Sequence, residues 1–324
     1  MKNQIIVADA IEGLTQIESE TVKMCVTSPP YFGLRDYGIA GQIGLEETPE
    51  EFIQKLVDVF REVKRVLTQD GTLWVNIGDS YAGGAGRWGK EKGLSTEQAT
   101  NHGSFGQIGA AKRWKHESIK QKDLIGIPWL LAFALRADGW YLRQDIIWHK
   151  LNPMPESVTD RCTKSHEYIF LLSKSPRYYF DNGAIKEHAF VGKDMGFLRG
   201  KSIDVNSDDC IAWHSESIKK RKDVGVDSHT AGDGMKNKRD VWSTPTSSYK
   251  EAHFAVFPPE LITPCILAGS RKGDIVLDCF MGSGTTAVTA MQNERDYLGV
   301  ELNPEYAAIA ERRISQTTVQ MKLF

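Results

Sequence analysis

Residues 275–286 read Ile-Val-Leu-Asp-Cys-Phe-Met-Gly-Ser-Gly-Thr-Thr, a short apolar run followed by an acid and a glycine-rich turn. The apolar run predicts a buried strand, and the pattern of Thr285–Gln292 predicts a helix directly after the turn. A strand, a glycine turn and a helix N-terminus together form a crevice that binds nucleotide-like ligands. Gly282 and Gly284 let the backbone approach such a ligand closely, and the two threonines are expected to cap the helix.

Two acids beside the glycine turn narrow the class of ligand. Asp278 precedes the turn, and Glu301 ends the next predicted strand, Tyr297–Val300, where an acid can bind a ribose diol. A dinucleotide is disfavoured because Ala287 stands where a third glycine belongs, and because Asp278 would face a pyrophosphate. A cationic sulfonium cofactor without phosphates suits Asp278 better.

A second motif lies near the N-terminus, where the predicted strand Met24–Thr27 runs into Ser28-Pro29-Pro30-Tyr31. Two prolines restrict the backbone and remove donors, so the carbonyls of Ser28 and Pro29 are expected to face outward as a rigid pair of acceptors. Such acceptors can hold an amine with its lone pair directed at an incoming methyl group. Tyr31 supplies a ring on which a base taken out of a duplex can stack, a contact worth roughly 1–3 kcal/mol.

Strands alternate with helices along much of the chain, which predicts an α/β fold with a mostly parallel sheet covered on both faces. The other predicted strands are Ile5–Ala8, Thr72–Ile77, Ile146–Trp148 and Tyr168–Leu172; the other predicted helices are Glu50–Leu67, Leu124–Ala137, Leu261–Ala268 and Pro304–Ile314. The polar, weakly periodic region 185–250 is interpreted as a small inserted module, and the glycine-rich stretch 82–109 as a mobile loop.

Charge is distributed unevenly, although the formal net charge is only -2. Affinity for nucleic acid must therefore come from local basic patches. One patch lies in the segment 81–122 and another spans 219–239, and the residues expected to contact DNA are Arg113, Lys115, Lys120, Lys220 and Arg239.

Taken together, the motifs resemble the β-group of DNA amino-methyltransferases, in which the catalytic Ser-Pro-Pro-Tyr motif precedes the Phe-x-Gly-Ser-Gly cofactor motif. The resemblance implies catalytic roles for Ser28, Pro29, Pro30 and Tyr31. It implies cofactor-binding roles for Asp9, Phe257, Asp278, Phe280, Gly282, Ser283, Gly284, Thr285 and Glu301. One departure is Cys279, where the family commonly has proline, and this loosens a turn without removing a ligand group.

The family's architecture is a Rossmann-like methyltransferase fold with a mostly parallel, seven-stranded, circularly permuted sheet. The resemblance implies that the last strand and helix pack beside the first strand. It also implies three segments: 1–184 as the catalytic half with a mobile basic loop at 81–122, 185–250 as the target-recognition segment, and 251–324 as the cofactor-binding half.

The expected activity is methyl transfer from S-adenosylmethionine to the exocyclic N4 amine of a flipped cytosine in double-stranded DNA. Cytosine is favoured by a family tendency, because serine opens the Pro-Pro-Tyr motif, and adenine N6 stays open as the alternative. An NAD-linked oxidoreductase and an inactive DNA-binding relative are less favoured.

Cysteine usage and hydropathy bear on the setting of the protein. Five cysteines without paired spacing indicate no structural disulfide and no metal site, and Cys265 is expected to lie in a buried helix rather than act as a nucleophile. With no membrane segment expected, a cytoplasmic protein of prokaryotic or phage origin is indicated. A separate cognate restriction endonuclease, and a monomer or a homodimer, are left open.

Overall fold

The computed structural model describes residues 1–34, 38–39, 41–82, 116–188, 235–248 and 255–322. It divides into two compact units, Met1–Asp181 together with Arg239–Phe324, and Asn182–Lys238. The second unit holds a two-stranded antiparallel ribbon of β6 (Glu187–His188) and β7 (Met235–Lys236). Its extent differs from the expected recognition segment 185–250, whose function stays a prediction.

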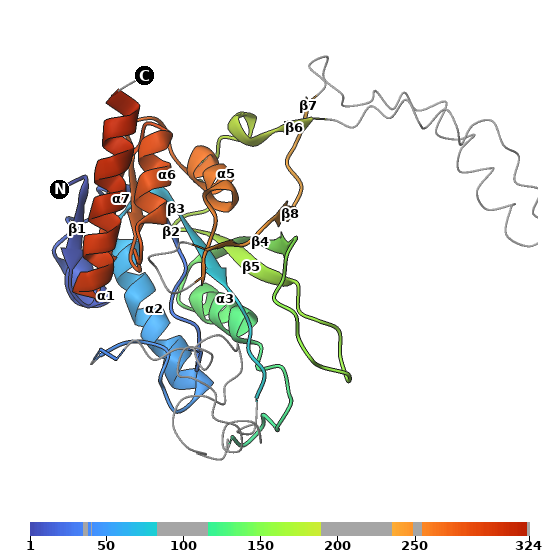
Figure 1. Ribbon diagram of the computed structural model, residues 1–324. Helices are drawn as coiled ribbons and strands as arrows, with labels where there is room; N and C mark the ends of the chain where they lie inside the picture. Colours follow the sequence, from blue (N-terminus) through green and yellow to red (C-terminus); the bar gives the residue numbers. More distant parts are fainter. Residues whose placement is uncertain (35–37, 40, 83–115, 189–234, 249–254, 323–324) are drawn as a thin grey trace, which may run out of the picture. The chain divides into compact units, whose positions relative to one another are not determined.

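An eight-stranded sheet forms the centre of the first unit, with the order β1-β12-β11-β2-β3-β5-β4-β8 (Figure 1). Neighbours are parallel except where β5 pairs antiparallel with β3 and with β4. The strands are β1 (Gln4–Val7), β2 (Val22–Thr27), β3 (Leu67–Ile77), β4 (Tyr141–Lys150), β5 (His166–Ser173), β8 (Val241–Thr244), β11 (Ile275–Asp278) and β12 (Asp296–Glu301). The mostly parallel sheet expected from the sequence is confirmed.

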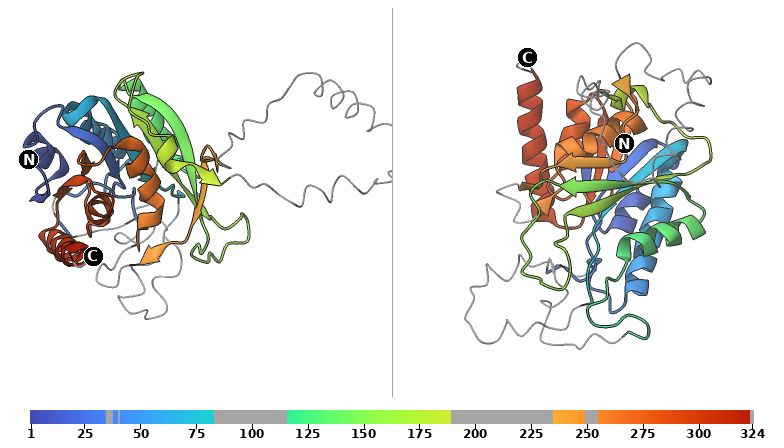
Figure 2. Two further views of the ribbon diagram at one scale, coloured as in Figure 1. Left: turned by 90° about the horizontal axis from the view of Figure 1, so that it is seen from above. Right: turned by 90° about the vertical axis from the view of Figure 1, so that its right-hand side faces the viewer.

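Helices cover both faces of this sheet, as Figure 2 shows. One layer holds α1 (Ala10–Thr15), α2 (Pro49–Val66) and α3 (Ile127–Ala137); the other holds α5 (Pro259–Gly269), α6 (Thr285–Gln292) and α7 (Pro304–Lys322). A further two-stranded ribbon is formed by β9 (Ser247–Ser248) and β10 (Ala255–Val256). No helix in the described part of the chain is long and apolar enough to span a bilayer.

Local sequence signals explain why α2 forms where it does. The Thr48 side chain accepts a hydrogen bond from the Glu51 amide at 3.2 Å, and Pro49 occupies the first helical turn. Apolar residues recur at helical spacing and are fully buried against the sheet and α3, among them Phe52, Leu56, Phe60 and Val63.

The chain order of the sheet is permuted, because its last strand pairs with its first. β12 lies parallel to β1, with Gln4 opposite Leu298 and Val7 opposite Glu301. On its other side β12 pairs with β11, which in turn pairs with β2. The carboxyl ends of β11 and β2 are therefore neighbours although some 250 residues separate them in the chain.

The sheet has eight strands rather than the expected seven, because β8 adds to its edge beside β4. This strand falls inside the region that was interpreted as an inserted module. It is four residues long and only Trp242 is buried, so its alternation is too short to stand out from the polar sequence around it.

Gly284 permits a close approach between α6 and α7 that a side chain would block. An added Cβ would lie 2.8 Å from Ala310 Cβ, and φ is +82°. Gly273 has a similar φ of +80° with nothing within 4 Å of an added Cβ. Gly273→Ala therefore isolates the backbone strain, which costs about 1 kcal/mol after the gain from a stiffer unfolded chain.

We expect Gly284→Ala to lower the free energy of unfolding by about 1–3 kcal/mol more than Gly273→Ala, because overpacking adds to the same strain. Urea denaturation of the two variants and the wild-type protein measures the difference. Equal losses would contradict the close packing of α7 on the glycine turn.

Candidate functional site

The glycine turn is organised around a buried carboxylate at the end of β11. Asp278 is 1% exposed, and its oxygens accept hydrogen bonds from the Phe280 amide at 3.0 Å and the Thr286 hydroxyl at 2.6 Å. A third bond comes from the Thr27 hydroxyl at 2.5 Å. Burial raises the pKa of Asp278 in spite of these donors. Asp278 thus ties the turn to the end of β2, where the Ser-Pro-Pro-Tyr motif starts.

Glu301, the last residue of β12, binds the glycine turn through its carboxylate. Its carboxylate accepts the Gly282 amide at 2.7 Å and the Asn303 amide at 2.8 Å. Burial raises the pKa of Glu301, while these two amide bonds oppose the shift. Gly282 has a φ of +53°, and a Cβ added there would meet only Phe280 O, at an ordinary contact distance of 3.9 Å.

The start of α6 is held differently from the sequence expectation. The helix N-cap is Gly284, which has no side chain, so the expectation that Thr285 and Thr286 cap the helix is wrong. The Thr286 hydroxyl donates to Asp278, and the Thr285 hydroxyl accepts from Arg313 of α7 at 3.3 Å. Both threonines are buried and serve to link α6 with β11 and α7.

Arg313 also fixes the middle of the turn. Its guanidinium donates to the carbonyl oxygen of Ser283 at 2.6 Å and to the Ser283 hydroxyl at 2.9 Å. Ser283 itself is 3% exposed, so it is part of the packed base of the turn. The sequence reasoning did not identify Arg313, which lies on a helix 28 residues beyond Thr285.

The other predicted cofactor residues border the same edge of the sheet. Asp9 follows β1 and caps α1 by accepting the Ile11 amide at 2.9 Å, one residue after Ala8, whose amide donates to Glu301 O at 3.1 Å. Phe280 is half-buried and bonded through its amide to Asp278. Phe257 is buried just before α5.

The Ser-Pro-Pro-Tyr motif follows β2 at the same edge. Pro29 is buried, whereas Ser28, Pro30 and Tyr31 are half-buried. The Tyr31 ring lies against Gly78, since a Cβ added to that glycine would be 2.8 Å from Tyr31 Cε2. The outward direction of the Ser28 and Pro29 carbonyls stays a prediction.

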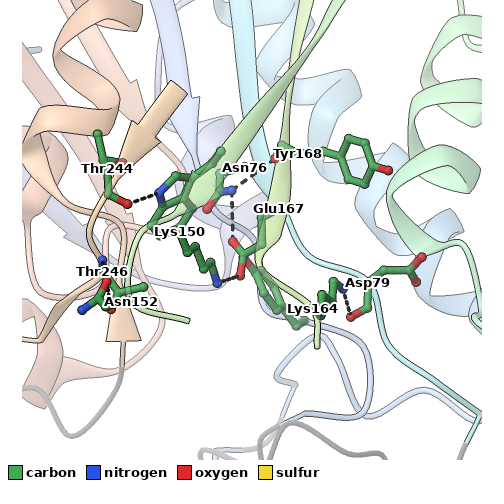
Figure 3. Close-up of polar contacts among 11 residues, drawn as sticks. Asn76, Asp79, Lys150, Asn152, Lys164, Glu167, Tyr168, Thr244 and Thr246 are labelled. Carbon is green, nitrogen blue, oxygen red and sulfur yellow. Dashed lines mark hydrogen bonds and ion pairs between the residues drawn. The ribbon is translucent and has the colours of Figure 1, made fainter. Parts of the chain in front are cut away.

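The Tyr31 hydroxyl is bound by a side chain that the sequence reasoning passed over. It donates to Glu167 Oε2 at 2.6 Å, and Asn76 Nδ2 donates to the same oxygen at 3.2 Å. Lys150 forms an ion pair with Oε1 of this carboxylate (Figure 3). The only signal for Glu167 was its place directly before the predicted strand Tyr168–Leu172.

A neighbouring cation anchors the segment that precedes β5. Lys164 Nζ donates to Asp79 O at 2.6 Å, as Figure 3 shows, and burial lowers the pKa of Lys164. The Asp79 carboxylate in turn accepts the Gly126 amide at 2.9 Å and the Ile127 amide at 3.0 Å, at the N-terminus of α3.

The structure describes two of the five residues expected to contact DNA, Lys120 and Arg239. Arg113, Lys115 and Lys220 lie outside the described residues. Lys120 is exposed, and its amide donates to Asp123 at 2.8 Å; Arg239 is exposed just before β8. The two ends of the basic segment 81–122 meet at the end of β3, where Ala82 N donates to Asp123 O at 2.8 Å. The role of these side chains in DNA binding stays a prediction.

Comparison with known proteins connects this site to a family. The family model "DNA methylase" matches residues 22–312, which include both loops. The chain is 46% identical over 306 residues to Type II methyltransferase M.Cfr9I of Citrobacter freundii, covering 94% of this chain and 85% of that protein. It is 45% identical over 311 residues to Type II methyltransferase M.SmaI of Serratia marcescens, covering 96% and 90%.

Solved structures share the fold. A protein from Thermus thermophilus that was crystallised with S-adenosyl-L-methionine superposes with a TM-score of 0.57 at 23% identity, covering 97% of this chain and 94% of that one. PvuII DNA methyltransferase, described as cytosine-N4-specific, superposes with a TM-score of 0.60 at 16% identity, covering 98% and 91%. The expected Rossmann-like methyltransferase fold is thereby confirmed. With its match over residues 22–312, the chain belongs to the N6/N4 DNA methylase family, whose members use S-adenosylmethionine to methylate DNA.

Proposed function

We propose that this protein methylates the exocyclic N4 amine of cytosine at specific sites in double-stranded DNA, with adenine N6 as the alternative target. The observation that carries the proposal is the hydrogen bond between Thr27 and Asp278, which joins the Ser-Pro-Pro-Tyr loop to the glycine turn. A methyl donor on the turn and a base amine on the loop would then be neighbours. Ser28 supports cytosine through the family tendency described above.

The residues of the turn suit S-adenosylmethionine. Glu301 is partly exposed and offers a carboxylate to a ribose diol, and Gly282 has no side chain that would occupy the space of the ligand. Asp278 is 1% exposed and accepts three donors of the chain, so we propose that it positions the two loops and adds negative potential near the sulfonium. Asp9, Phe257, Phe280, Ser283, Gly284 and Thr285 are proposed to complete the cofactor site.

The chemistry needs orientation more than acid or base. S-adenosylmethionine supplies a methyl group whose bond to sulfur breaks, with its electrons going to sulfur, as the amine nitrogen bonds to the carbon. The carbonyls of Ser28 and Pro29 would hold the two amine hydrogens, and Tyr31 would stack on the ring of the base. The methylated amine then loses a proton to water.

The wider biological role is proposed from the relatives. Two relatives that cover most of this chain are named Type II methyltransferases, and we propose that this protein acts beside a separate cognate restriction endonuclease. We propose that the basic segment 81–122, including Arg113, Lys115 and Lys120, contacts DNA phosphates. We further propose that the region around 185–250, with Lys220 and Arg239, reads the sequence.

The nature of the product tests the proposal most simply. DNA incubated with the protein and methyl-labelled S-adenosylmethionine should, after enzymatic hydrolysis, yield labelled N4-methylcytosine in mass spectrometry. Sequencing of the methylated DNA then locates the recognition site. N6-methyladenine would select the alternative target, and 5-methylcytosine or unlabelled DNA would reject both.

Removing the Glu301 carboxylate tests the cofactor site. We expect Glu301→Ala to weaken binding of S-adenosylmethionine in calorimetry by about 1.5–3 kcal/mol, because a charge-assisted bond and the anchor of Gly282 are both lost. Glu311→Ala, an exposed glutamate of α7, is the matched control and should bind normally. An unchanged affinity of the Glu301 variant would remove this residue from the site.

Truncating Tyr31 separates catalysis from cofactor binding. Tyr31→Ala should lower the rate of methyl transfer roughly ten- to a hundredfold through lost stacking, with the affinity for S-adenosylmethionine unchanged. Tyr141→Ala, which removes a half-exposed tyrosine at the amino-terminal edge of the sheet, should keep full activity. Normal turnover of Tyr31→Ala on saturating DNA would show that the loop is not the catalytic centre.

A further inference from the structure

Glu167 accepts donors from three different segments at the edge of the sheet that carries the catalytic loop. It stands at the start of β5, which runs antiparallel to β3 and β4, so it meets their carboxyl ends. Its donors are Tyr31 after β2, and Asn76 in β3 and Lys150 at the end of β4, both labelled in Figure 3. Glu167 is 8% exposed, so these contacts replace water around the carboxylate.

The partners of Glu167 are themselves fixed in place. Asn76 Nδ2 also donates to Tyr168 O at 3.1 Å, and Lys150 Nζ lies 4.7 Å from the centre of the Trp148 ring. Trp148 in turn donates through Nε1 to Thr244 O of β8 at 3.1 Å. The position of the Glu167 carboxylate is therefore fixed by connected contacts among residues of β3, β4, β5 and β8.

The carboxylate is a charged acceptor despite its burial. Burial favours the neutral acid, but Lys150, together with the hydrogen bonds from Tyr31 and Asn76, holds the pKa of Glu167 below its ordinary value. A hydroxyl that donates to an ionised carboxylate forms a shorter and stronger bond than one that donates to a neutral group. The Tyr31 side chain is thus held at its hydroxyl end by Glu167 and at its ring edge by Gly78.

We propose that Glu167 is a positioning residue for methyl transfer: through the Tyr31 hydroxyl it fixes the ring on which the flipped target base stacks. The inference rests on the proposed role of Tyr31. A tyrosine without this bond could turn about its side-chain torsions, and the flipped base would then spend less time aligned with the methyl donor. Lys150 and Asn76 contribute by keeping Glu167 charged and in one orientation.

A double-mutant cycle on Tyr31→Phe and Glu167→Gln tests this chain of contacts. Tyr31→Phe keeps the ring and removes only the hydroxyl, and Glu167→Gln keeps the shape and removes the charge. Each single variant should lower kcat about tenfold, and the double variant should be no slower than the slower single variant, because both remove the same bond. The affinity for S-adenosylmethionine and the KM for the duplex should stay near their wild-type values.

A matched control separates positioning from stability. Asp70→Asn also removes a carboxylate that pairs with a buried lysine, Lys23, but at the amino-terminal edge of the sheet. It should lower the free energy of unfolding, as Glu167→Gln does, while leaving kcat unchanged. If Glu167→Gln does not fold, Tyr31→Phe alone must still show the loss of kcat at unchanged cofactor affinity.

Three results would overturn the inference. They are a wild-type kcat for Tyr31→Phe, a wild-type kcat for Glu167→Gln, and independent losses that multiply in the double variant. The proposed role of the Tyr31 ring fails separately, when Tyr31→Ala also turns over normally, and the proposed function fails when the wild-type protein forms neither N4-methylcytosine nor N6-methyladenine. An impaired Tyr31→Ala with an active Tyr31→Phe would reject the role of Glu167 and keep that of the ring.

Discussion

The hydrogen bond from the Thr27 hydroxyl to the Asp278 carboxylate at 2.5 Å joins the two loops on which the proposed chemistry depends. Because Asp278 is buried and its other donors come from Phe280 and Thr286, the same carboxylate shapes the glycine turn and the start of α6. A buried carboxylate without hydrogen-bond donors would lower the stability of the fold, so the loss of any of the three donors to Asp278 is unfavourable. These bonds thereby fix the distance between the two loops.

The permuted chain order makes this junction possible. β11 and β2 are neighbours in the sheet, so the residues after each strand meet at one edge. Helix α7 packs against this junction. Arg313 of α7 donates a hydrogen bond to Ser283, and α7 approaches Gly284 closely. On the opposite side of the Ser-Pro-Pro-Tyr loop, Glu167 connects Tyr31 to the antiparallel half of the sheet. The Ser-Pro-Pro-Tyr loop is thus bound by two buried carboxylates: Asp278 joins it to the glycine turn, and Glu167 holds the Tyr31 hydroxyl.

The sequence predicted most of what lies along single strands and turns. The glycine turn, the Ser-Pro-Pro-Tyr motif and α6 could be located because glycine, proline and apolar runs act locally. Contacts between distant segments could not be predicted: Arg313, Asn76 and Glu167 have no local feature that reveals their partners. The strand β8 was missed because four residues with one buried side chain carry too little periodicity. The threonine caps were predicted wrongly because Gly284 occupies the N-cap position, and Thr285 and Thr286 already lie inside the helix.

The most direct test of the account is a crystal structure of the protein with a recognition duplex and an unreactive analogue of S-adenosylmethionine. The account predicts a target base turned out of the duplex and stacked on Tyr31, with its exocyclic nitrogen about 3–3.5 Å from the position of the transferred methyl group. The Thr27–Asp278 bond should be unchanged in that complex. A target base held away from Tyr31, or an analogue bound elsewhere than on the glycine turn, would contradict it.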